Sequence, residues 1–335
     1  MTSQLRHQAA MTKYLLIGGN GVIGHFVARR LVAQGHRPIV MSRGGDTTLI
    51  ADIVDDCDLM RADMTDAARV NEVVRDGGVT HILHLGAALP SVTEIDPIAA
   101  IRLNLEGSAN VLEAARKNGV KRVVMASSKA VYGEVSGEYR APTNRPIPES
   151  QSDPATMYGI TKFSSEMLGR WYARTHGFEF IALRFAATVG PGKIARHGGS
   201  YSRYSVVLEH AMGGKPVVIR NGADAVCDVI FNDEAARGIV CAMQSSSARH
   251  DVYNIATGTG FTLRDYAAAV KRRFPAAEIS FDELKAGAGS GSGDFVLDPA
   301  RARNELQFIA DSNLDNIVGG YVSTMELLGL APDLH

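Results

Sequence analysis

A tyrosine and a lysine stand four residues apart in the motif Tyr158-x-x-x-Lys162. On a helix this spacing puts the phenol and the ammonium group on the same face. A free tyrosine has a pKa of about 10, and a neighbouring cation favours its ionised form, so the pair can exchange a proton with a substrate hydroxyl. We predict that Tyr158 is a general acid/base and that Lys162 tunes it. The spacing also arises by chance, so other residues must support this prediction.

Two serines, Ser127 and Ser128, follow the apolar run 122–126. Such a run is typical of a buried strand, and open α/β sheets bind ligands at the carboxyl edge of their strands. A hydroxyl at this edge can hold the reacting oxygen of a substrate. We predict this role for Ser128, with Ser127 as the second choice and a simple strand-end cap as the alternative.

A glycine-rich segment, Gly18-Gly19-Asn20-Gly21-Val22-Ile23-Gly24, lies between an apolar run at 14–17 and a helical pattern at 22–34. Glycines there permit a tight strand-to-helix turn and close approach of a pyrophosphate, which the helix N-terminus neutralises. The context predicts a dinucleotide site, with a structural glycine turn as the alternative. Its predicted contacts in this segment are Gly18, Gly21, Val22, Ile23 and Gly24.

The residues after the second apolar run bear on the choice of cofactor. NAD-binding units usually place an acidic residue about 20 residues beyond the glycines, whereas this chain has Ser42 and Arg43. A hydroxyl and a guanidinium suit a 2′-phosphate, so we predict NADP, with NAD as the alternative and a solvent-exposed Arg43 as the simpler interpretation. Further on, Asp63, followed by Met64, either accepts a hydrogen bond from the adenine or caps a helix.

Short apolar runs alternate with longer amphipathic segments through the first half of the chain. Runs at 38–41, 81–85, 122–126 and 180–183 are expected strands, and 98–118 and 154–177 are expected helices. This alternation predicts an α/β fold, a Rossmann-type doubly wound parallel sheet with a smaller C-terminal substrate domain. We expect an N-terminal extension at 1–10 and a dinucleotide-binding domain at 11–185. Residues 186–335 are expected to form mainly the substrate domain, with some segments returning to the first.

Composition excludes several classes of protein. The 335 residues carry a formal net charge of −1, which leaves no basic surface for nucleic acid or an anionic membrane. No run approaches the roughly 18 apolar residues of a membrane span, and the first ten residues lack an apolar signal core. Cys57, Cys227 and Cys241 form no CxxC pair and the histidines no HExxH motif, so we expect reduced thiols, no metal and a cytoplasmic location.

The glycine motif, the segment 127–133 and Tyr158-x-x-x-Lys162 together resemble the extended short-chain dehydrogenase/reductase family, the NAD-dependent epimerase/dehydratase group. Further matches lie at 104–108, 183–192, 228–234 and 253–258. The resemblance implies a catalytic triad of Ser128, Tyr158 and Lys162, and a homodimer formed through helices near 98–118 and 156–171. It also implies a set of residues close to the cofactor: Leu85, Gly86, Ala87, Ala88, Asn104, Ala126, Tyr158 and Lys162.

Departures from the family pattern bear on the chemistry. Dehydratases carry an Asp-Glu pair after the catalytic hydroxyl, where this chain has Lys129 and Ala130, so no carboxylates remain for water elimination. Sugar-nucleotide epimerases commonly carry an arginine where this chain has Cys227, so a nucleotide-linked sugar is less favoured. A basic segment after Gly192 suits an anionic or hydroxylated substrate, with a solvated loop as the alternative.

We therefore predict an NAD(P)-dependent oxidoreductase that interconverts a secondary alcohol and a ketone on a small polar substrate such as a sugar or sugar acid. The alternative is an NAD-dependent sugar or sugar-nucleotide epimerase that uses the same triad. The predicted substrate contacts are Ser91, Ser127, Ser128, Thr188 and Arg196.

Overall fold

The computed structural model describes residues 12–140, 143–197, 202–220, 222–282, 294–311 and 313–334, without the side chains of residues 196 and 197. The predicted N-terminal extension at 1–10 and the predicted contact Arg196 therefore lie outside the described residues or side chains.

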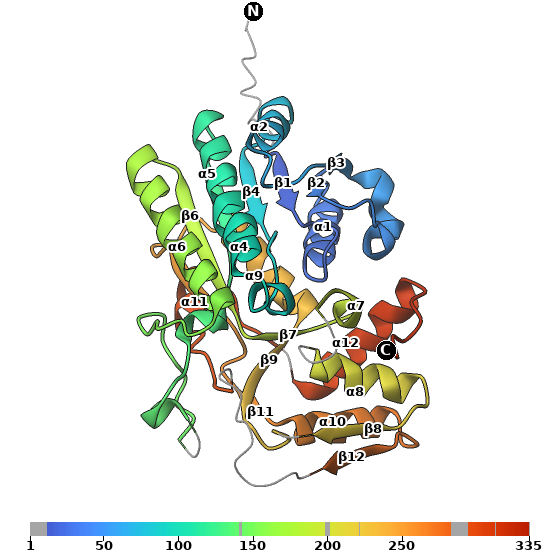
Figure 1. The fold of residues 1–335 in the computed structure, drawn as a ribbon. Coiled ribbons are helices and arrows are strands. Elements are labelled where there is room, and N and C mark those ends of the chain that lie inside the picture. Colours follow the sequence, from blue (N-terminus) through green and yellow to red (C-terminus); the bar gives the residue numbers. More distant parts are fainter. Residues whose placement is uncertain are drawn as a thin grey trace, which may run out of the picture.

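A seven-stranded sheet forms the centre of the molecule (Figure 1), in the order β10-β6-β5-β4-β1-β2-β3. Every neighbouring pair in it is parallel. The chain order reverses between β1 and β4, which is the switch point where such sheets bind ligands. The fold is thus the predicted Rossmann-type α/β fold. The strands are β1 (Tyr14–Ile17), β2 (Ile39–Ser42), β3 (Asp58–Arg61), β4 (His81–His84), β5 (Arg122–Ser128), β6 (Glu179–Phe185) and β10 (Val252–Ile255).

Helices cover both faces of this sheet because its strands are apolar on both sides. On β1, Leu16 belongs to one core cluster, whereas Leu15 and Ile17 belong to a second. The first cluster includes residues of α1 (Gly24–Ala33) and α9 (Asn232–Gln244). The second includes residues of α2 (Ala67–Asp76) and α5 (Gly107–Lys117), and the long helix α6 (Met157–His176) packs beside α5.

The helix expected over 98–118 is interrupted. It consists of α4 (Pro97–Ala100), a π-helical segment η2 (Ile101–Glu106) and α5. The carbonyl of Asn104 accepts hydrogen bonds from Ser108 Oγ at 2.5 Å and from Ser165 Oγ, on α6, at 3.0 Å. A wider turn of this kind is common where a helix contributes to a functional site.

The chain after β6 builds a second region that begins at the carboxyl edge of the large sheet (Figure 1), where β7 (Ala187–Val189) follows β6 almost directly. β7, β9 (Cys227–Phe231) and β11 (Gly260–Phe261) form one small sheet, and β8 (Val217–Arg220) pairs with β12 (Ile279–Asp282). Its helices are α7 (Lys193–His197), α8 (Arg203–Met212), α10 (Leu263–Arg273), α11 (Ala300–Glu305) and α12 (Leu314–Leu327). Part of this half belongs to the large sheet, because β10 pairs with β6 at its edge and α9 packs against β5 and β6.

Four short helical segments complete the described elements: η1 (Thr48–Asp56), α3 (Pro90–Thr93), η3 (Lys129–Tyr132) and η4 (Gly137–Tyr139). Within the described ranges, no helix has the length and apolarity needed to span a bilayer. Cys57, Cys227 and Cys241 are free thiols, as the sequence predicts.

Candidate active site

The glycine motif forms the turn between β1 and α1. Gly18 has a φ of +79°, and its N–H donates to Met41 O at 2.8 Å. A Cβ on Gly24 would lie 2.2 Å from the carbonyl oxygen of Gly18. Only glycine fits at this approach, so the residue types and the backbone agree with a phosphate-binding turn at a helix N-terminus.

A cavity of about 430 Å³ opens beside this turn, along the carboxyl ends of β1, β2, β3 and β4. Its size falls within the range of small-molecule and cofactor sites, and its lining is mainly apolar. It brings together many of the residues predicted for the cofactor, namely Gly18, Ser42, Arg43, Asp63, Met64, Gly86, Ala87 and Ala88, and also Ser91 from the predicted substrate set. These residues fit the adenosine half of a dinucleotide.

Asp63 lines this cavity without capping a helix. Its carboxylate accepts from Thr65 N at 2.9 Å and Thr65 Oγ1 at 2.8 Å, which lowers its pKa. The N-cap of α2 is instead Asp66, which accepts from Arg69 N. The helix-cap alternative for Asp63 was therefore wrong.

Ser128, Tyr158 and Lys162 lie together at the carboxyl end of β5. The Ser128 hydroxyl accepts a hydrogen bond from Ala130 N at 3.1 Å, so it caps the end of the strand. It also acts to lower the pKa of the neighbouring Tyr158 phenol. Lys162 donates to the carbonyl of Ala126 at 2.7 Å, and its amino group lies 5.9 Å from the centre of the Tyr158 ring. The arrangement can hold a substrate oxygen between a hydroxyl and a phenol.

The start of α6 sets this geometry. Thr156 caps the helix by accepting a hydrogen bond from Gly159 N. Gly159 packs against the turn after Ser128 so closely that a Cβ would lie 2.4 Å from Ala130 O. Tyr158 is thereby held against the end of β5.

Burial dominates the protonation of the pair. It raises the pKa of Tyr158 to about 12, while the hydrogen bond from Ser128 acts in the opposite direction. It lowers the pKa of Lys162 to about 8, against the attraction of Glu166. The spacing to Lys162 predicts a lowered pKa for Tyr158, whereas in the protein by itself the pKa is raised. The cost of burying a phenolate outweighs the favourable effect of the nearby cation.

Ser127 does not join this cluster. Successive side chains of a strand point to opposite faces, and Ser127 donates to the carboxylate of Glu166 at 2.5 Å in the core. Glu166 is paired with Arg184. The second-choice substrate role of Ser127 is thus contradicted. Sequence reasoning missed this ion pair, although Glu166 follows Lys162 by four residues, one helical turn.

Asn104 joins the cavity wall to α6. Its Oδ1 accepts from Ala88 N at 2.6 Å, and its Nδ2 donates to Ala88 O at 3.1 Å and to Thr161 Oγ1 at 3.0 Å. Because Asn104 is buried and these groups are satisfied, it fixes the loop after β4 relative to the helix that carries Tyr158 and Lys162.

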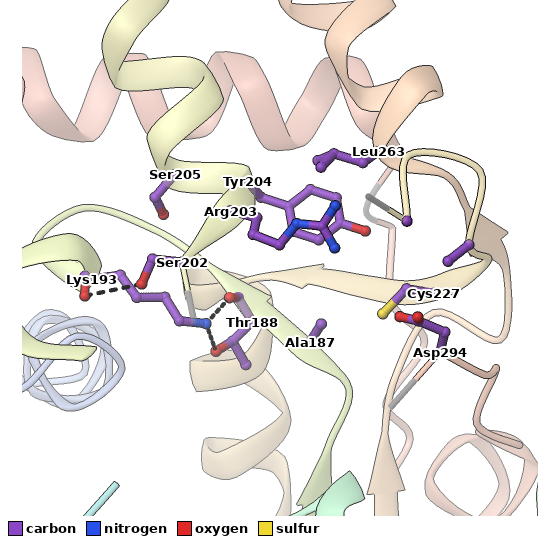
Figure 2. A pocket seen from close by; sticks show the side chains of 12 residues that line it. Ala187, Thr188, Lys193, Ser202, Arg203, Tyr204, Ser205, Cys227, Leu263 and Asp294 are labelled. Atoms are coloured by element: carbon purple, nitrogen blue, oxygen red, sulfur yellow. Dashed lines mark hydrogen bonds between the residues drawn. The ribbon is translucent and has the colours of Figure 1, made fainter. Parts of the chain in front are cut away.

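A second cavity of about 130 Å³ lies in the C-terminal region (Figure 2). Thr188, predicted as a substrate contact, lines it together with Lys193 and Cys227. The sequence analysis did not predict Lys193 as a site residue. Its only signal in the sequence was the basic character of the segment after Gly192.

The model of the NAD dependent epimerase/dehydratase family matches residues 14–256, well over half of the chain. The chain therefore belongs to this family. Membership makes it an NAD-dependent enzyme and agrees with the seven-stranded fold and the glycine turn.

The relatives divide between two activities. A UDP-glucose 4-epimerase of Streptomyces lividans is 27% identical over 90% of this chain and 94% of its own. The structure of a UDP-glucose 4-epimerase from Brucella ovis in complex with NAD is 25% identical, with a TM-score of 0.78 over 92% of this chain and 96% of that chain. The holo form of a GalE-like L-threonine dehydrogenase from Cupriavidus necator is also 25% identical, with a TM-score of 0.79 over 93% of this chain and 99% of that chain.

Proposed function

We propose that this chain is an NAD-dependent epimerase that inverts a carbinol carbon of a sugar-type substrate. The observation that carries this proposal is the cluster of Ser128, Tyr158 and Lys162 at the carboxyl edge of the sheet that also carries the glycine turn. The relatives named above favour an epimerase over the dehydrogenase that the sequence analysis placed first. The order of the two hypotheses is therefore reversed.

In this mechanism Ser128 holds the reacting oxygen and Tyr158, once ionised to the phenolate, takes its proton. The dinucleotide, held by the glycine turn and the larger cavity, would supply the hydride chemistry, that is, acceptance of a hydride from the carbon and its return to the other face. Lys162 contributes a positive charge beside the phenol, which favours proton removal, and Tyr158 returns the proton at the end. Asn104 keeps the loop after β4 in place throughout.

We further propose that the cofactor site accepts a 2′-phosphate, so that NADP binds as well as or better than NAD. Ser42 and Arg43 line the adenosine end of the cavity, where NAD-specific units carry a carboxylate. Support for NAD comes from the family and from the Brucella ovis complex.

A dehydrogenase is the second candidate, because Cys227 stands where sugar-nucleotide epimerases commonly carry an arginine. The likeness to an L-threonine dehydrogenase points the same way. In that case the hydride stays on the cofactor and the ketone is released.

One assay separates the two. The purified protein is loaded with NAD or NADP and incubated with UDP-glucose, sugar acids, sugar phosphates and L-threonine in turn, while absorbance at about 340 nm and the products by NMR are followed. An epimerase interconverts two stereoisomers with no net change in absorbance. A stoichiometric rise in absorbance with release of a ketone would overturn the epimerase and favour the dehydrogenase.

We also propose a homodimer that forms through α5 and α6. This rests on the resemblance and on apolar side chains of α6 that remain exposed, with Met167 at 45% and Trp171 at 50%. Light scattering at micromolar concentration should give twice the mass of the chain, and Trp171→Glu should halve it. A monomeric mass for the wild type contradicts the proposal.

A further inference from the structure

The small cavity of about 130 Å³ is lined by side chains from several elements, four of which follow one another in the sequence region after β6. β7 contributes Thr188, α7 Lys193, α8 Arg203 and β9 Cys227. Figure 2 shows the side chain of Lys193 extending to Thr188, with Arg203 above it and Cys227 on the far side of Thr188 from Lys193. Two basic side chains thus line one small, partly open cavity.

Lys193 is unusual because its ammonium group is almost fully buried, at 8% exposure of the residue. Its amino group donates to the carbonyl and, at 2.9 Å, to the hydroxyl of Thr188, which are both neutral. Burial and repulsion from Lys129 lower the pKa of Lys193 to about 8, and Cys227 acts against this. A charge buried among neutral partners is costly, and a bound anion would remove that cost.

Lys129 extends from the reaction centre to the wall of this cavity. It directly follows the catalytic Ser128, and its amino group lies 3.0 Å from Cys227 Sγ. The family's usual arginine is absent at position 227, but lysines from two other elements bring positive charge to the same place. Of the described residues that line the cavity, Asp294 alone carries a carboxylate, against the basic Lys193 and Arg203.

The cavity is small. Sites for drug-sized ligands usually hold about 300 to 1,000 Å³, and the space here is about 130 Å³. A carboxylate or a single phosphate fits in such a volume, and the rest of a larger ligand would extend out through the open side of the cavity.

We propose that this cavity binds a compact anionic group of the substrate through Lys193, Lys129 and Arg203, so that the substrate is a sugar acid or a sugar phosphate in place of a nucleoside-diphosphate sugar. The proposal deepens the function proposed above and rests on it for the sugar. Lys129 follows Ser128 directly in the chain and reaches Cys227 in the cavity wall, so one residue connects the two sites.

Calorimetric titration of the full-length, cofactor-loaded protein tests this. The probes are inorganic phosphate, galacturonate, glucose 1-phosphate, UDP and the neutral sugar galactose. We expect glucose 1-phosphate or galacturonate to bind at least about tenfold tighter than galactose and tighter than UDP, since hydrogen bonds to charged groups contribute roughly 1.5–3 kcal/mol. The tighter of the two identifies the group as phosphate or carboxylate.

Lys193→Met and Lys129→Met should each weaken that binding at least about tenfold. Lys215→Met, at an exposed loop before β8, is the matched control and should bind within about twofold of the wild type. Thermal melts establish that each variant is folded. If Lys193→Met does not fold, the Lys129→Met variant still tests the proposal, because Lys129 is partly exposed. Wild-type anion binding in a folded lysine variant, or UDP binding tighter than both compact anions, overturns the proposal.

Failure of the proposed function has a different signature. Tyr158→Phe removes the proton-transfer group but leaves the cavity unchanged, because Tyr158 does not line it. Anion binding should therefore persist in that variant. If the wild type transfers no hydride but binds the anions through Lys193, the proposed reaction fails while the anion site stands.

Discussion

Glu166 and Arg184 form a buried ion pair beside Ser127 of β5, with 0% and 1% of their side chains exposed. Two nitrogens of Arg184 donate to the two carboxylate oxygens at 2.9 and 2.7 Å. Removal of one partner leaves the other charge buried, so Glu166→Gln should lower the free energy of unfolding by about 3–5 kcal/mol. Urea denaturation measures it. The exposed pair Arg272–Asp315 offers a control, where Asp315→Asn should cost less than about 1 kcal/mol; equal losses at both sites would contradict the argument.

Tyr158→Phe should reduce kcat by about 10²–10⁴, because the variant keeps the ring but cannot exchange the proton. Cofactor affinity, measured by fluorescence titration, should change little. If turnover stays near the wild-type value, Tyr158 is not the proton-transfer group.

Gly159→Ala should impair catalysis, since its Cβ would lie 2.4 Å from Ala130 O and push the start of α6 away from Ser128. Gly319 in α12 is the matched control, because a Cβ added there would have no neighbouring atom within 4 Å. Gly319→Ala should raise stability by up to about 1 kcal/mol through helix propensity. Steady-state kinetics and thermal melts on both variants make the comparison; an active Gly159→Ala would show that the contact is not needed.

His84 should make the fold sensitive to acid. Burial lowers its pKa to about 3, whereas in the unfolded chain it is about 6.5. As pH falls from 6.5 towards 3, the unfolded state binds a proton that the folded state does not, so stability falls by about 1.4 kcal/mol per pH unit. His84→Gln can keep the hydrogen bond to Ser108 without titrating.

Urea denaturation of the wild type and His84→Gln at several pH values checks this. Between pH 6.5 and 5 the wild type should lose about 2 kcal/mol more than the variant. Between pH 7 and 8 the two should change in parallel. Parallel curves over the whole range would mean that His84 takes up its proton in the folded state too.

Arg43→Ala should weaken NADP binding by about 1.5–3 kcal/mol, or roughly 10- to 100-fold, and leave NAD binding nearly unchanged, because only NADP has the 2′-phosphate. Parallel titrations with both cofactors provide the measurement. No effect on either cofactor would place Arg43 in solvent, and an equal loss for both would place it against a group that the two share.

The sequence by itself determined the architecture and the enzyme family. Of the two activities that it left open, it placed first the one that the relatives favour less. Short apolar runs with helical segments between them identify the parallel strands, since local periodicity reports burial on both faces of a sheet. The glycines from Gly18 to Gly24 identify the cofactor turn, because steric demands there are local. The spacing of Tyr158 and Lys162 puts both on one helix face for the same reason.

Only the tertiary structure decided which groups meet across distant segments. Ser127 and Ser128 are chemically identical, and the pleat of β5 sends one to Glu166 and the other to Tyr158. The raised pKa of Tyr158 depends on burial by the whole fold. Lys129, Lys193 and Cys227 approach one another from segments up to 98 residues apart. Long-range packing of this kind leaves no periodic or motif signal in a single sequence, so the candidate anion site could not be predicted from it.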